Sequence, residues 1–227
     1  MTCSASRAAP ARPRIAVTPE AAAHLARRDV RLGRLIAALG PLSRERDPDA
    51  FTSLVHHIVG QQISGKAQAA VWARLLALAG LEEAVTPGAV LRLGEAGVRS
   101  AGMSAKKAQW ITEIARRADS GRLDLPGLEA LSDEEVVARL TDLPGVGVWT
   151  AEMILIFGLG RGNVLSFGDF GIRAGLMRLY GHKALPRARF DVYARRFSPF
   201  GTAASLLIWE VGNGRADPTA WLPRRTR

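Results

Sequence analysis

The sequence has almost no cysteine and no long apolar run. Its only cysteine is Cys3, which excludes a disulfide framework, a cysteine-based zinc site and a four-cysteine iron–sulfur cluster. No apolar stretch approaches the ~18 residues that a membrane-spanning helix needs. Residues 1–14 consist mainly of Ala, Arg and Pro, without the hydrophobic segment of a secretion signal. We therefore expect a cytoplasmic protein with no membrane contact.

Strand patterns are also missing, whereas helical patterns are frequent. No long stretch alternates apolar and polar residues, and no internal repeat is present. From Ala50 the apolar residues follow the i, i+3, i+4 spacing of a helix buried along one face. Signals for a helix start occur at five positions, namely Thr18, Ser64, Ser104, Ser132 and Asp169. The sequence predicts an all-α fold of ten or eleven helices, with a loop from Gly94 to Gly102 and a connector from Arg44 to Asp49.

Basic residues exceed acidic ones by ten, 31 against 21. Six arginines lie near the two ends, which leaves 25 basic and 21 acidic residues between Ile15 and Pro223. A mild excess in the body favours an anionic partner, but it is too small for a protein that coats DNA with lysines. With 48% hydrophobic residues, the chain can form a substantial core.

The stretch from Leu143 to Asp169 is the most informative one. Gly145 and Gly147 follow Pro144, a pattern typical of a tight turn with positive backbone dihedrals and exposed N–H groups. An apolar helical run from Val148 to Phe157 follows directly. Unpaired N–H groups at a helix start can bind a phosphate without reading base sequence. The alternative is an ordinary turn between two helices.

Four motifs in order resemble one family. They are FTSLVHHIVGQQIS at 51–64, GMSAKKAQWI at 102–111, LPGVGVWTA at 143–151 followed by Asp169, and SLLIWE at 205–210. The chain resembles the helix-hairpin-helix DNA glycosylase superfamily, in its 3-methyladenine DNA glycosylase II branch, over about Val17 to Trp221. The low cysteine content separates it from the endonuclease III branch, many members of which carry an iron–sulfur cluster.

The resemblance implies a two-lobed helical fold with the active cleft between the lobes. Residues 50–167 would form the central lobe with the hairpin, and residues 17–49 plus 168–221 would form the lobe of the chain ends. Residues 1–16 would be a disordered basic tail. The length corresponds to a compact form that lacks an N-terminal β domain, and we expect a monomer.

Asp169 is the expected catalytic residue. The family carries its catalytic aspartate at this position, where it stabilises positive charge on the sugar as the base–sugar bond breaks. A simple helix cap is the alternative, and both roles are compatible because a helix start stabilises a carboxylate. Relatives often have two adjacent aspartates here, and Gly168 replaces the first.

Two tryptophans match family positions that line the pocket for the flipped base, Trp149 and Trp209. Glycosylases that also cut the strand have a lysine where Trp149 stands, so the resemblance implies a monofunctional enzyme that leaves an abasic site. An indole can also attract a cationic alkylated base. Without the resemblance, both would be read as core tryptophans.

The remaining expectations concern DNA contacts and ions. In the family the turn before Ser64 enters the minor groove and fills the gap left by the extruded base, a role that falls to Gln62; the alternative is a polar turn without a ligand. Lys106 and Lys107, in the first turn of a predicted helix, are interpreted as a solvated face. His56 and His57 cannot share one helix face, so we expect core-edge histidines rather than a metal site.

Family members also bind a monovalent cation at the hairpin. By position, the backbone carbonyls of Thr141, Leu143 and Val146 would bind Na⁺ or K⁺, and the chemistry would require no cofactor. The expected partner is double-stranded DNA with alkylated bases. Two alternatives stay open: a non-catalytic DNA-binding module, and a glycosylase for another lesion such as uracil.

Overall fold

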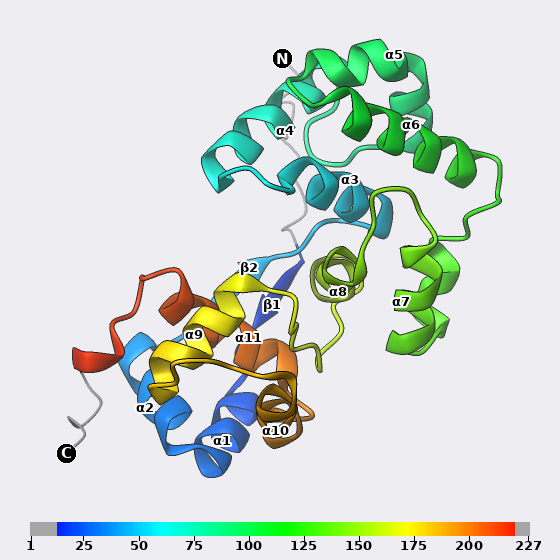
Figure 1. The fold of residues 1–227 in the computed structure, drawn as a ribbon. Coiled ribbons are helices and arrows are strands. Elements are labelled where there is room, and N and C mark those ends of the chain that lie inside the picture. Colours follow the sequence, from blue (N-terminus) through cyan, green and yellow to red (C-terminus); the bar gives the residue numbers. More distant parts are fainter. Residues whose placement is uncertain (1–12, 221–227) are drawn as a thin grey trace, which may run out of the picture.

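The computed structural model describes residues 13–220 of the chain, and this part is helical apart from one small sheet (Figure 1). The strands are β1 (Arg14–Ala16) and β2 (Ser43–Glu45). The α-helices are α1 (Pro19–Arg28), α2 (Val30–Leu39), α3 (Ala50–Gly60), α4 (Gly65–Ala79), α5 (Pro87–Ser100), α6 (Ala105–Asp119), α7 (Asp133–Thr141), α8 (Val148–Phe157), α9 (Phe170–Tyr180), α10 (Arg187–Phe197) and α11 (Gly201–Gly212). Two short 3₁₀ helices cover Pro126–Ala130 and Pro218–Ala220. None of the helices described has the length and hydropathy of a membrane span.

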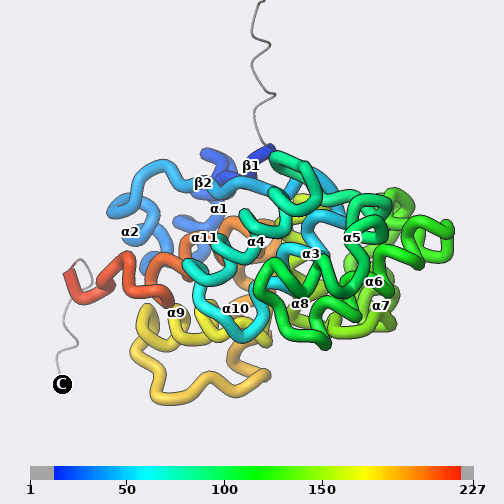
Figure 2. Tube along the Cα trace, turned by 90° about the horizontal axis from the view of Figure 1, so that it is seen from above, coloured from blue at the N-terminus to red at the C-terminus, as the bar shows by residue number. Residues whose placement is uncertain are grey.

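The helices form two lobes, which confirms the predicted fold class. Figure 2 shows the segments from both chain ends gathered on one side and the cyan-to-green middle of the chain on the other. Buried apolar side chains form two clusters accordingly, one from residues 50–164 and one from residues 21–35 and 172–216. Trp209 packs against both clusters. This tryptophan therefore lies where the lobes meet.

A two-stranded sheet is the main departure from the sequence prediction. β1 pairs antiparallel with β2, with Arg14 opposite Glu45. The expectation of a disordered tail over residues 1–16 is therefore wrong for Arg14–Ala16, and residues 1–12 lie outside the described part. Strands of three residues are too short to show an alternating pattern. The sheet lies between the lobes (Figure 1), and Ile15 packs against the cluster of the central lobe.

Local capping chemistry explains most helix starts. The side chains of Thr18, Ser64, Ser104 and Asp169 each accept a hydrogen bond from a first-turn N–H, and Ser132 forms a capping box with Glu135. All five predicted starts are thus confirmed. The loop expected from Gly94 is wrong. α5 runs through this glycine with a change of direction, because Gly94 adopts φ 63° and ψ 177°.

One very apolar helix lies in each lobe. α8 and α11 have few charged residues, and most of their side chains are buried. A helix that is apolar on all sides must be surrounded by other elements. Accordingly, α8 packs against α3 and α7, and α11 packs against α9, α2 and α10.

Small residues let α9 and α11 approach until their backbones touch. A Cβ atom on Gly212 would lie 2.0 Å from the carbonyl oxygen of Gly171, and one on Gly175 would lie 2.3 Å from that of Ile208. No side chain fits into such spaces without moving a helix. The three glycines therefore set the distance between α9 and α11.

We expect Gly212→Ala to lower the free energy of unfolding by about 1–3 kcal/mol, because the added methyl group must push α11 away from α9. Gly65→Ala, at the first residue of α4, is the matched control, since its Cβ would meet no heavy atom within 4 Å. Urea denaturation of both variants measures the difference. Equal stability of the two variants would show that the helix crossing tolerates a side chain.

A largely buried histidine, His57, lies at the junction of the lobes. Nε2 of His57 is 3.8 Å from Oδ2 of Asp47, and its ring centroid is 5.5 Å from that of Phe157. Phe157 in turn stacks on Trp209, with centroids 6.0 Å apart. Burial lowers the pKa of His57 to about 4, although Asp47 opposes this shift and His56 adds to it. The imidazole is therefore neutral in the folded protein near pH 7.

A neutral buried histidine makes stability depend on pH. The pKa of His57 is about 4 in the folded protein and about 6.5 in an unfolded chain. Above about pH 6.5 the histidine is neutral in both states and the folded protein keeps its full stability. As the pH falls from about 6.5 towards 4, the unfolded chain binds a proton that the folded protein does not, so the free energy of unfolding decreases. Between pH 7 and 5 the wild type should lose about 2 kcal/mol of unfolding free energy from this group. The His57→Gln variant lacks this titrating group, so its loss of unfolding free energy between pH 7 and 5 should be smaller than that of the wild type by about 2 kcal/mol. Parallel denaturation curves at the two pH values test this, and identical losses would contradict it.

Candidate active site

Three N–H groups from three helices bind the carboxylate of Asp169. Oδ1 accepts hydrogen bonds from the backbone N–H of Ile172 at 2.8 Å and from Nε1 of Trp209 at 2.8 Å. Oδ2 accepts one from Nε1 of Trp149 at 2.9 Å. Only 8% of Asp169 is exposed. All three partners are donors and the residue caps α9, so the surroundings stabilise negative charge.

Each tryptophan reaches Asp169 from the very apolar helix of its lobe, α8 or α11. Trp149 stands in the first turn of α8, and Trp209 stands in the last turn of α11. Two glycines leave room for them: a Cβ on Gly171 would lie 2.9 Å from Cδ1 of Trp209, and one on Gly168 would lie 3.3 Å from Cβ of Trp149. Because the hydrogen bonds use the indole edges, they fix the planes of the rings.

The segment between α8 and α9 is anchored along its length. The N–H of Thr202 binds the carbonyl of Gly162, and the N–H of Val164 binds the hydroxyl of Thr202. Ser205 donates its hydroxyl to the carbonyl of Val164 at 2.8 Å. These bonds from α11 fix a segment without helix or strand, so the position of Asp169 relative to α8 is defined.

The turn between α7 and α8 forms the predicted hairpin. Gly145 has φ +78°, and a Cβ there would lie 2.2 Å from Cε3 of Trp110. The expectation of a positive dihedral is wrong for Gly147, which has φ −97° and forms the N-cap of α8. No side chain caps α8. Its first N–H groups therefore have no side-chain acceptor, and Gly147 is exposed beside them.

The turn of Gln61 to Ser64, called the α3–α4 turn below, is tied to this hairpin. Nε2 of Gln61 donates to the carbonyl of Gly145 at 2.8 Å and to the hydroxyl of Thr150 at 3.2 Å. Gln62 is exposed and adopts φ +57°. Among the described residues, every other one with a positive φ is a glycine. Of the two glutamines, Gln61 is engaged in the protein, and Gln62 is the one presented to solvent.

Sequence patterns missed several neighbours of the site. Glu152, one turn after Trp149, accepts a hydrogen bond from the hydroxyl of the buried Ser166, and burial raises the pKa of Glu152. Phe170, next to Asp169, is 83% exposed. The interpretation of Lys107 as part of a solvated face is wrong. Its ammonium group donates hydrogen bonds to backbone carbonyls of α3 and of the α3–α4 turn. In the sequence, the only signals for these neighbours are the proximity of Glu152 to Trp149 and of Phe170 to Asp169.

The expected cation ligands lie along the hairpin, between the end of α7 and the start of α8. Thr141 ends α7, Val146 precedes Gly147, and the carbonyl of Leu143 accepts the N–H of Val146 at 3.2 Å. A carbonyl oxygen has two acceptor positions, so this bond leaves one for an ion. Within residues 13–220, no three His, Cys, Asp or Glu side chains gather as a metal site.

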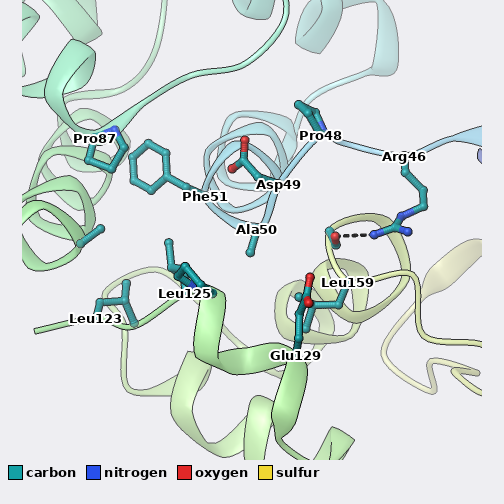
Figure 3. A pocket seen from close by; sticks show the side chains of 13 residues that line it. Arg46, Pro48, Asp49, Ala50, Phe51, Pro87, Leu123, Leu125, Glu129 and Leu159 are labelled. Atoms are coloured by element: carbon teal, nitrogen blue, oxygen red, sulfur yellow. Dashed lines mark hydrogen bonds between the residues drawn. The ribbon is translucent and has the colours of Figure 1, made fainter. Parts of the chain in front are cut away.

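The apolar recess in Figure 3 is separate from this site. It has a volume of about 450 Å³ and is lined by residues such as Phe51, Leu125 and Glu129. Arg46 at its edge donates to the carbonyl of Gly158 at 2.7 Å. Asp169 and the two tryptophans are absent from its lining.

Comparison with known proteins points to one family. The family model described as "HhH-GPD superfamily base excision DNA repair protein" matches residues 55–190. DNA-3-methyladenine glycosylase 1 of Schizosaccharomyces pombe is 31% identical over 186 residues, which cover 80% of each chain.

Solved structures agree with this match. A crystal structure of a DNA-3-methyladenine glycosidase from Bacillus halodurans has 32% identity and a TM-score of 0.76, covering 91% of this chain and 96% of its own. The S. pombe 3-methyladenine DNA glycosylase in complex with abasic DNA has 28% identity and a TM-score of 0.75, covering 92% and 100%. The chain belongs to the helix-hairpin-helix superfamily of base excision DNA repair proteins.

Proposed function

We propose that the protein is a monofunctional DNA glycosylase that removes alkylated bases of the 3-methyladenine type from double-stranded DNA. Relatives that match most of the chain carry the name DNA-3-methyladenine glycosylase. The observation that carries the proposal is the buried carboxylate of Asp169, which two indole N–H groups and a helix start bind in one orientation.

The two oxygens of Asp169 have different tasks in this proposal. A carboxylate oxygen accepts about two hydrogen bonds, so Oδ1, with two donors, is saturated, whereas Oδ2, with one, can accept another. Oδ2 would therefore orient the attacking water. The negative charge of the group stabilises the positive charge that develops on the sugar as the glycosidic bond lengthens. Water takes the place of an enzyme amine, and the product is an abasic site.

The tryptophans would form the wall of the base pocket. A target base must leave the helix stack before a carboxylate can reach its sugar. The ring faces of Trp149 and Trp209 suit a flipped base that carries positive charge, with a cation–π attraction of ~1–2 kcal/mol when desolvated. The same positive charge makes the base a good leaving group, so the reaction does not need a strong general acid.

The hairpin and the α3–α4 turn would hold the DNA. The hairpin backbone at Gly145, Val146 and Gly147 would bind a phosphate. The N–H groups of Gly145 and Gly147 would be the donors, because that of Val146 is bonded to the carbonyl of Leu143. The start of α8, whose N–H groups no side chain caps, would support them. Gln62, exposed at its turn, would fill the gap left by the flipped base. A monovalent cation on the carbonyls of Thr141, Leu143 and Val146 would join hairpin and phosphate.

We propose lobe boundaries from the two apolar clusters. Residues 50–167 would form the central lobe, and residues 17–49 with 168–221 the other. The clusters support this division because one contains buried residues from 50 to 164 only, and the other contains none from that interval. Asp169 follows directly on the boundary, which would place the chemistry between the lobes.

Asp169→Asn should lower single-turnover release of 3-methyladenine from methylated duplex DNA by roughly 10²–10³-fold, because the variant loses the negative charge at the sugar. Asparagine can still cap α9, so binding to a duplex with an abasic-site analogue should change only a few-fold. Asp49→Asn is the matched control, since Asp49 caps α3 in the same way, accepting from the N–H of Thr52 at 2.7 Å.

Equal release by wild type and Asp169→Asn, with binding intact, would contradict the catalytic assignment. No release by either protein, with binding intact, would favour the rival function, a non-catalytic module in which the hairpin binds DNA and Asp169 only caps α9. A panel of duplexes with single lesions, uracil among them, measures which base is released fastest. Preference for uracil would replace the proposed substrate and remove the two arguments that depend on a positively charged base, while the role of Asp169 would stand.

Monofunctional chemistry predicts no covalent intermediate. Borohydride reduction during incubation with an abasic or uracil-containing duplex should trap no protein–DNA adduct, because Trp149 stands where strand-cutting relatives have the lysine that forms a Schiff base. Denaturing gel electrophoresis of the mixture measures the adduct. A trapped species would show that another amine attacks the sugar.

A further inference from the structure

The backbone of the α3–α4 turn needs support. Gln62 has φ +57°, and a left-handed conformation is unfavourable for a residue with a side chain. The residue is exposed, so its own side-chain packing does not hold this conformation in place. The contacts of its neighbours, Val59 and Gln61, must do so.

Lys107 makes two of these contacts. Its Nζ donates to the carbonyl of Val59 at 2.8 Å and to the carbonyl of Gln61 at 2.7 Å. Both carbonyls lie at the C-terminal end of α3, where carbonyl groups lack helical partners and carry negative partial charge. A single ammonium group thus closes the end of α3 and fixes the residue before Gln62.

This position is unfavourable for Lys107 within its own helix. It lies in the first turn of α6, where a cation opposes the helix dipole, and burial lowers its pKa. Its neighbour Lys106 is exposed, and its ammonium group lies 5.4 Å from the ring centroid of Trp110. Only Lys107 has partners outside α6 that offset the cost.

The same helix also supports the hairpin. One turn after Lys107, the ring of Trp110 occupies the space where Gly145 has no side chain. Gln61 completes the connection, because its side chain binds the carbonyl of Gly145 while its own carbonyl binds Lys107. α6 therefore contacts both elements to which we assign DNA binding.

We propose that Lys107 is a positioning residue that fixes the α3–α4 turn in the conformation that presents Gln62 to the DNA. The inference rests on the proposed function, in which Gln62 fills the gap left by the flipped base. Lys107 itself does not touch the base. It keeps the turn in one conformation before DNA binds, so that no binding energy is spent on ordering it.

The test compares Lys107→Met with Lys106→Met in single-turnover excision at a temperature well below both melting points. On a duplex with a paired alkylated base, Lys107→Met should be slower on the order of tenfold or more, and Lys106→Met should stay within about twofold of wild type. The loss should shrink when the lesion lies in a mismatch, because that base is extruded more easily. Lys107→Arg, which keeps donors at this position, should recover part of the rate.

A double variant separates positioning from general stability. If Lys107 acts through Gln62, then Gln62→Ala with Lys107→Met should be no slower than Gln62→Ala alone. Additive losses, equal losses on paired and mismatched lesions, or equal rates for the two lysine variants would each overturn the proposal.

A measurement without DNA separates this proposal from the proposed function. Amide hydrogen exchange at residues 61–64 should become faster in Lys107→Met and remain unchanged in Lys106→Met, while exchange in α9 stays the same in both. Unchanged exchange at the turn would refute the positioning role even if the enzyme is a glycosylase. If exchange at the turn is faster in Lys107→Met but the wild-type protein releases no alkylated base, only the proposed function is refuted.

Discussion

The hydrogen bonds on Asp169 are the constraint on which the rest of the structure depends. They join α8, α9 and α11, which belong to different lobes, at one carboxylate. Because the donors are two indoles and one backbone amide, none of them can lose a proton or carry charge of its own. These fixed dipoles stabilise and orient the negative charge of the carboxylate. That preorganised charge would in turn stabilise a positive charge developing nearby without reorganisation during the reaction.

Several features serve to bring these three helices together. The glycines of α9 and α11 allow backbone contact, which places Trp209 beside the start of α9. The segment from α8 to α9 is bonded to α11, which defines the distance from Trp149 to Asp169. In the central lobe, α6 contacts both the hairpin and the α3–α4 turn, through Trp110 and Lys107. The geometry of the site is therefore the result of helix packing.

Local chemistry explains how much of this was predictable. A capping residue acts within three positions of itself, so the helix starts at Ser132 and Asp169 can be read from the sequence. Contacts between distant positions cannot be read in this way. Gln61 meets Gly145 across 84 positions, and the partners of Lys107 lie nearly fifty positions earlier. Nothing in the sequence near Lys107 distinguishes it from Lys106, and the roles assigned to Trp149 and Gln62 came from family resemblance alone.

The construction of one lobe from both ends of the chain has a consequence for synthesis. Leu25 and Leu35 of α1 and α2 belong to the same buried cluster as Leu207 and Val211 of α11. On the ribosome, α1 and α2 emerge before the other helices of this cluster and remain without these partners until α11 has been made. The central cluster, which is contiguous in sequence, can form earlier. The carboxylate between the lobes is therefore assembled only after the central cluster, and only a chain synthesised as far as α11 acquires the site.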